Sequence, residues 1–110
     1  MSAKFEMYRD VQQQYRFRLK AGNGEIILAS EAYVQKAGCE NGIQSVKAHA
    51  PYDANYQKLT AQNGKYYFNL LANNYQVIGT SQMYQSTAGR DVGIQSVKTN
   101  APNAPVLDLT

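Results

Sequence analysis

The chain repeats itself at an offset of 51 residues. Residues 15–51 align without a gap on residues 66–102, and 18 of these 37 positions are identical. The longest identical block is Gly-Ile-Gln-Ser-Val-Lys, at 42–47 and again at 93–98. Such a unit is long for a solenoid repeat, and two copies are too few to build one. We therefore interpret the chain as a duplicated half-domain with a pseudo-twofold axis, like a dimer fused into one chain.

The repeat continues outward with weaker similarity. Phe5 falls on Tyr56 at the same offset, and Tyr56 falls on Leu107, so the first strand is predicted in three copies. Residues 5–14 and 56–65 share no identical position, so we expect any site that breaks the symmetry to lie there. The prediction is a single domain, 1–110, with repeats at about 4–51 and 55–102 and a C-terminal strand near 105–109.

Alternating apolar and polar residues predict strands. Residues 14–20 place Tyr15, Phe17 and Leu19 on one face of a half-buried strand. The sequence Gly-Asn-Gly at 22–24 then predicts a hairpin turn, because Asn and Gly accept a positive φ at low cost. The opposite face of the strand carries Arg16, Arg18 and Lys20. Further strands are predicted at 4–8, 25–29, 56–60, 66–71 and 76–80.

Two helices are predicted after these strands, at 35–48 and 86–99. Cys39, Ile43, Val46 and Ala50 recur at spacings of 4, 3 and 4, which is one face of a helix. Ser86 is the predicted N-cap of the second helix. Pro51 and Pro102 follow as stop signals. Glycines recur inside both helices and indicate close packing, against the sheet or against the other helix: Gly38, Gly42, Gly89 and Gly93.

This order of elements predicts an α+β fold. Each unit has three strands, a helix and a further strand, so the sheet should be mainly antiparallel. Two helices of this length can cover only one face of a sheet of six or seven strands. The other face should therefore be open.

Several segments together resemble the YegP-like family of small bacterial proteins. They are residues 17–25, residues 30–33, the doubled Gly-Ile-Gln-Ser-Val-Lys, residues 64–70 and residues 81–84. The resemblance covers about residues 4–110. It implies tandem β(3)-α-β units in a single sheet, with the last strand of each unit exchanged between units. It implies no activity, ligand or catalytic residue, because the family is uncharacterised.

Composition and charge exclude several classes of protein. Apolar residues make up 44% of the chain and charged residues 17%, which excludes a disordered chain, a collagen and a coiled coil. The longest apolar run, 26–29, is too short for a membrane span. One cysteine excludes an intramolecular disulfide and suits a reducing compartment. With no signal-peptide segment at the N-terminus, the predicted location is the cytoplasm.

No residue pattern predicts a catalytic, cofactor or metal site. The sequence has no phosphate-binding loop, dinucleotide fingerprint or nucleophile elbow. Cys39 is expected to be a small buried apolar residue. His49 is expected at the surface near the end of the first helix, where a cation suits the helix dipole. The second copy has Arg90 and Asn100 at these positions, so neither residue belongs to the shared pattern. The sequence thus favours a non-enzymatic protein without a cofactor.

One surface supports a functional hypothesis. The open face should carry Arg16, Arg18 and Lys20 from one strand, and Tyr67 and Asn69 from the matching strand of the second copy. Cations beside an aromatic ring on an open sheet can bind single-stranded nucleic acid, although a net charge of +3 does not require it. The alternatives are a solvated face that keeps the protein soluble, and a face that binds a protein partner, as in an interaction or stress-accessory protein. We expect a monomer, since the duplication supplies internally what a dimer would supply.

Overall fold

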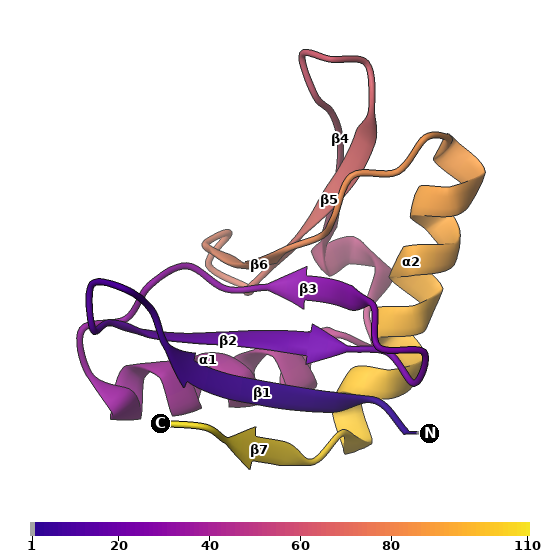
Figure 1. Ribbon diagram of the computed structural model, residues 1–110. Coiled ribbons are helices and arrows are strands. Elements are labelled where there is room, and N and C mark those ends of the chain that lie inside the picture. The colour runs from indigo at the N-terminus through magenta and orange to yellow at the C-terminus, as the bar shows by residue number, and fades with distance from the viewer. Residues whose placement is uncertain (1) are drawn as a thin grey trace.

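The computed structural model describes residues 2–110, and its elements follow the predicted order (Figure 1). The first unit contains β1 (Lys4–Arg9), β2 (Tyr15–Lys20), β3 (Ile26–Ala29) and α1 (Lys36–His49). The second contains β4 (Tyr56–Thr60), β5 (Tyr66–Leu71), β6 (Val77–Thr80) and α2 (Thr87–Asn100). The 3-10 helices η1 (Asp53–Asn55) and η2 (Ala101–Asn103) follow the α-helices, and the last strand is β7 (Val106–Asp108). Both α-helices begin one residue later than predicted.

The seven strands form one sheet in the order β4-β5-β6-β3-β2-β1-β7. Every neighbouring pair is antiparallel except β1 and β7, which are parallel. The two units meet where β3 pairs with β6, through Ala29 opposite Thr80. These residues are related by the offset of the repeat, so the pseudo-twofold axis passes between them. In Figure 1, β4 and β5 rise steeply from the layer formed by β1, β2 and β3, which shows how strongly the sheet bends.

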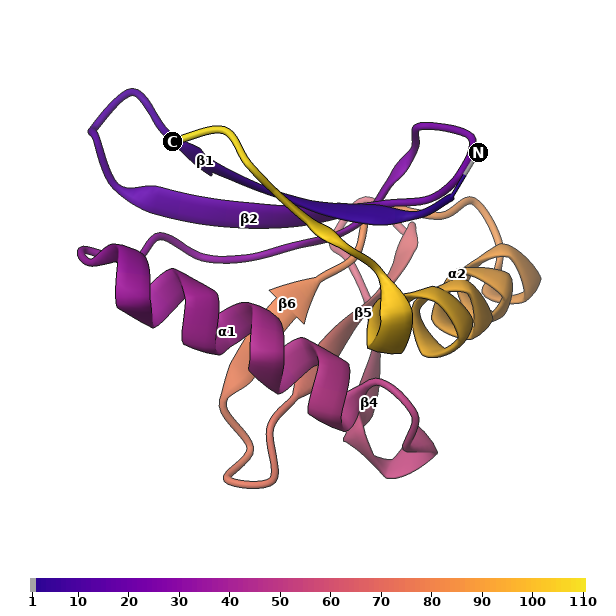
Figure 2. The same cartoon turned by 90° about the horizontal axis from the view of Figure 1, so that it is seen from below.

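Both helices lie on the same face of the sheet (Figure 2), as the sequence predicts. The predicted helix face is the buried one, because Cys39, Ile43 and Val46 are at most 1% exposed. Phe17 and Leu19 meet it from β2 and are fully buried. The equivalent residues of the second unit complete the core: Phe68, Leu70, Ile94 and Val97.

The strand after each helix lies in the other half of the sheet, which confirms the predicted exchange. After α2, β7 runs beside β1 of the first unit, where Phe5 N donates to Pro105 O at 2.8 Å. After α1, β4 pairs with β5 of the second unit. The strand β4 is therefore both the exchanged strand of the first unit and the first strand of the second.

The helix glycines pack against tyrosines that precede the helices, on the sheet side. A Cβ atom at Gly42 would lie 2.5 Å from Tyr33 Oη and 3.0 Å from Phe17 Cε2. Tyr33 in turn stacks on Phe17, with ring centroids 6.3 Å apart. Glycine is therefore needed to let the helix backbone approach these rings. At the start of α2, Ser86 Oγ accepts a hydrogen bond from Gly89 N at 3.0 Å, which confirms the predicted N-cap.

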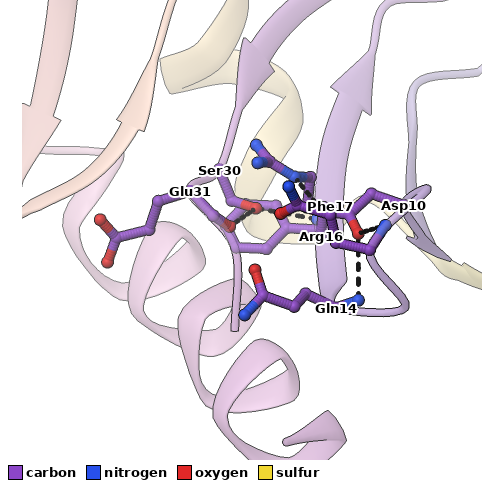
Figure 3. Close-up of polar contacts among 7 residues, drawn as sticks. Asp10, Gln14, Arg16, Phe17, Ser30 and Glu31 are labelled. Atoms are coloured by element: carbon purple, nitrogen blue, oxygen red, sulfur yellow. Dashed lines mark hydrogen bonds and ion pairs between the residues drawn. The ribbon is translucent and has the colours of Figure 1, made fainter. Parts of the chain in front are cut away.

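A serine at the end of β3 extends the backbone ladder (Figure 3). Ser30 Oγ accepts from Phe17 N at 2.9 Å and donates to the carbonyl oxygen of Glu31 at 2.7 Å. Ser81 makes the same two bonds at the end of β6, to Phe68 N and Gln82 O, with the same two distances. Both serines are buried. Each hydroxyl thus satisfies one backbone N–H group and one backbone carbonyl group at the point where a strand leaves the sheet.

Candidate functional site

The open face of the first unit carries a row of cations. Arg16, Arg18 and Lys20 alternate along β2 on the face away from the helices. The register places their partners on β1 directly opposite, with Tyr8 facing Arg16, Glu6 facing Arg18 and Lys4 facing Lys20. We call these six residues the basic face.

A buried carboxylate holds the cations of the basic face in place. Glu6 is 5% exposed and accepts a hydrogen bond from Arg18 Nε at 2.8 Å. The ammonium groups of Lys20 and Lys4 lie 3.3 Å and 3.7 Å from the same carboxylate. The hydrogen bond from Arg18, together with that from Lys20 and the charges of both, lowers the pKa of Glu6 below its usual 4.5. Glu6 therefore stays charged at neutral pH and neutralises part of the basic face.

A second carboxylate fixes Arg16 at the end of the β1–β2 turn (Figure 3). Asp10 Oδ2 accepts from Arg16 Nε at 2.8 Å. Its other oxygen accepts from the backbone N–H groups of Gln12 and Gln14, at 2.9 Å and 3.0 Å. The hydrogen bond from Arg16, followed by that from Gln14, lowers the pKa of Asp10. The carboxylate ties the turn to the arginine, so the turn sets where that guanidinium lies.

Tyr8 supplies the aromatic ring of the basic face. The guanidinium carbon of Arg18 lies 4.4 Å from the centre of the Tyr8 ring, a cation–π contact. Sequence reasoning missed Tyr8, Glu6 and Lys4 as site residues. A signal was present, because these three residues alternate along the predicted first strand and must share one face.

Tyr67 and Asn69 lie on the other half of the sheet. They occupy on β5 the places that Arg16 and Arg18 occupy on β2, and β3 and β6 separate the two strands. Asn69 Oδ1 accepts from Thr80 Oγ1 at 2.8 Å, and its Nδ2 donates to Gln57 Oε1 at 3.2 Å. The structure brings the three predicted cations together and leaves the two predicted neutral residues apart from them.

The two residues outside the shared pattern lie in α1, away from the basic face. Cys39 is fully buried, and burial raises the pKa of its thiol to about 11. His49 lies in the last turn of α1, where Nδ1 is 2.7 Å from the carbonyl oxygen of Ser45. Among residues 2–110, no three His, Cys, Asp or Glu side chains are grouped to hold a metal ion. Neither helix of the described part is long and apolar enough to cross a bilayer.

A family model described as a domain of unknown function, DUF1508, matches residues 10–57 and again residues 61–108. The chain belongs to the UPF0339 family, the YegP-like proteins. Its relatives include UPF0339 proteins of Acinetobacter baylyi and Stutzerimonas stutzeri, 57% and 54% identical over 110 and 109 residues. The alignments cover 100% and 99% of this chain and 99% and 98% of those proteins. The two matched segments fit the internal duplication.

Solved structures of this family have the same fold. The solution NMR structure of YegP from Escherichia coli, a protein of unknown function, matches with a TM-score of 0.94 at 50% identity. The match covers 100% of this chain and 95% of that one. The solution structure of a UPF0339 protein from Shewanella oneidensis matches with a TM-score of 0.93 at 53% identity, over 100% of this chain and 93% of that one.

Proposed function

We propose that this UPF0339 protein is a non-enzymatic binding module that holds single-stranded nucleic acid weakly on its basic face. The observation that carries the proposal is the way the two arginines are held. Each uses its Nε atom for a carboxylate, Arg16 with Asp10 and Arg18 with Glu6. A guanidinium has five N–H donors, so the terminal nitrogens of both arginines can still donate to a phosphate. Pre-positioned cations lose less conformational freedom when a phosphate binds.

The charge balance supports weak binding. Lys4, Arg16, Arg18 and Lys20 carry four positive charges, while Glu6 and Asp10 carry two negative ones. The remaining excess attracts a polyanion, and the two carboxylates limit the affinity. Tyr67 offers a half-buried ring on the neutral half of the same face, where a base of a longer strand can stack.

We also propose that the module works in the cytoplasm as a monomer. A single cysteine suits a reducing compartment. The duplication supplies within one chain the pairing that a single-unit protein would need from a second copy.

The test is fluorescence anisotropy with a labelled single-stranded oligonucleotide of about 12 nucleotides. If Arg16, Arg18 and Lys20 each hold one phosphate, the salt slope is about −2, and affinity falls roughly twentyfold between about 50 and 200 mM salt. Arg16→Ala and Lys20→Ala should each weaken binding and reduce that slope. Lys20→Ala leaves the bond between Arg18 and Glu6 in place, so it tests charge with little risk to folding.

Lys47→Ala is the matched control, because Lys47 lies in α1 on the opposite face and its removal changes net charge equally. Equal effects of Lys20→Ala and Lys47→Ala would show only a general charge effect and would overturn the proposal. Failure to bind at low salt would also overturn it. Binding of a protein to the same face with little salt dependence would favour the alternative of a protein partner.

A further inference from the structure

The edge strand β4 lacks a partner that its equivalent has. Among residues 2–110, the strand β1 pairs with β2 on one side and β7 on the other, whereas β4 ends the sheet and pairs only with β5. The difference shows in burial. Glu6 and Met7 of β1 are buried, while their equivalents Gln57 and Lys58 of β4 are exposed.

A cavity of about 410 Å³ lies along this free edge, between β4 and α2. On the first unit, the equivalent residues Phe5, Met7 and Ile43 are at most 2% exposed, and β7 runs along that edge. There, Leu109 N donates to Met7 O at 2.8 Å, and Lys36 of α1 pairs with Asp108 of β7 at 2.7 Å. The cavity is thus the place that a second β7 would occupy. It is lined by Asp53, Tyr56, Lys58, Asp91, Ile94 and Gln95.

The chain has no segment left to fill this cavity within the described residues. Only η1 separates α1 from β4, and the strand that follows α1 is β4 itself. The duplication therefore gives three copies of the first strand, β1, β4 and β7. Full twofold symmetry would need a fourth copy beside β4. Within the described part of the chain, no strand lies beside the outer edge of β4.

We propose that the free edge of β4 and the adjoining groove of α2 bind an extended segment of a partner protein, parallel to β4 and in the register of β7. The site is separate from the basic face and does not depend on the function proposed above. The register of β7 places Val106 beside Phe5 and Asp108 beside Met7. Shifting this register by the 51-residue offset of the repeat places an apolar residue of the partner beside Tyr56 and an acidic residue beside Lys58.

The charges of the groove complement an acidic residue of the partner beside Lys58. Lys58 lies 3.4 Å from Asp91, and Arg90 lies 3.3 Å from the same carboxylate. Two cations thus share one carboxylate, so Lys58, which lines the groove, can also attract an acidic residue of the partner. At the other end of the groove, Asp53 is already paired with Lys98.

A second copy of this chain fits the edge less well. In a symmetric antiparallel contact between two β4 strands, the central residue Lys58 would face its own copy. Like charges placed directly opposite each other destabilise strand pairing, and edge lysines oppose edge-to-edge association. The β7 segment of a second copy is already paired with β1 of its own chain. We therefore infer that the partner is a different protein whose segment is apolar and acidic, as β7 is.

The probe for the test is a synthetic peptide with the sequence of residues 103–110, added to the full-length ¹⁵N-labelled chain. We expect amide shifts at residues 56–60 and 91–95. Lys58→Glu should weaken binding about fivefold or more, and a peptide with lysine in place of its aspartate should restore it. Lys65→Glu is the matched control, because it makes the same charge change in the turn between β4 and β5.

Three results would overturn the proposal. Shifts confined to β1 and β7 would mean that the peptide only displaces the chain's own last strand. No shifts at about millimolar peptide would mean that the edge does not accept a strand of this kind. Shifts at β4 that grow with protein concentration in the absence of peptide would identify a second copy as the occupant.

Discussion

Replacing Ser30 with alanine removes one oxygen atom and two hydrogen bonds from the end of β3. Phe17 N loses its only described acceptor, and the carbonyl oxygen of Glu31 loses its donor. Phe17 is fully buried, so its N–H group cannot reach water while β2 stays paired. The bond from Ser30 N to Phe17 O, 2.9 Å long, does not involve the hydroxyl and remains. The substitution therefore isolates one unpaired buried amide.

The expected loss follows from that unpaired amide. Leaving a buried donor without an acceptor costs about 1–3 kcal/mol. The unfolding entropy near the melting temperature is about 2.1 cal/mol/K per residue, or about 0.23 kcal/mol/K for 110 residues. The melting temperature of Ser30→Ala should thus fall by roughly 4–13 °C.

The assay is thermal unfolding followed by far-ultraviolet circular dichroism. Ser81→Ala should lose as much as Ser30→Ala, because Ser81 makes the same bonds in the second unit. Ser2→Ala, at an exposed position before β1, is the control and should unfold like the wild type. A melting temperature unchanged in Ser30→Ala, or a loss at Ser30 without one at Ser81, would refute the reasoning.

Two further predictions concern titratable groups. The hydrogen bond from Arg18 lowers the pKa of Glu6, so this carboxylate stabilises the fold above the usual value of 4.5, and its contribution is lost as pH falls through the lowered pKa. Glu6→Gln should therefore be less stable than the wild type in urea titrations at neutral pH, and the gap should close in acid; a gap independent of pH would contradict the assignment. Burial raises the pKa of Cys39 to about 11, so a thiol reagent at about pH 8 should react far more slowly with the folded chain than with the urea-unfolded chain. Equal rates would mean that the thiol is accessible.

Much of the fold could be predicted because local patterns determine local structure. The alternation of Phe17 and Leu19 with basic residues identified both the strand and its buried face. The spacing of Cys39, Ile43 and Val46 did the same for α1. The junction between units was not predictable, because alternation tells which face of a strand is buried and not which strand lies beside it. The pairing of Ala29 with Thr80 is visible only in three dimensions.

The candidate site was predictable only in part for the same reason. One strand could be predicted to carry Arg16, Arg18 and Lys20 on one face. The contribution of Glu6 depends on the register between β1 and β2, which the sequence does not state. The free edge of β4 is harder still to predict from the sequence, because it is recognised only by comparison with β1, whose outer edge pairs with β7. Its residues nevertheless fall in 56–65, the segment where the two copies share no identical position.

Joining two copies in one chain changes how mutations act on the molecule. In a symmetric homodimer every substitution appears twice, so both halves must change together. In this chain a substitution alters one half only, and the halves can acquire different chemistry without separating on dilution. The open face records such a divergence, since each charged residue of the basic face has an uncharged equivalent at the offset of the repeat: Lys4 and Asn55, Glu6 and Gln57, Arg16 and Tyr67, Arg18 and Asn69, Lys20 and Leu71. The molecule has thereby become the single-chain counterpart of a heterodimer, with a fixed ratio of its two kinds of surface.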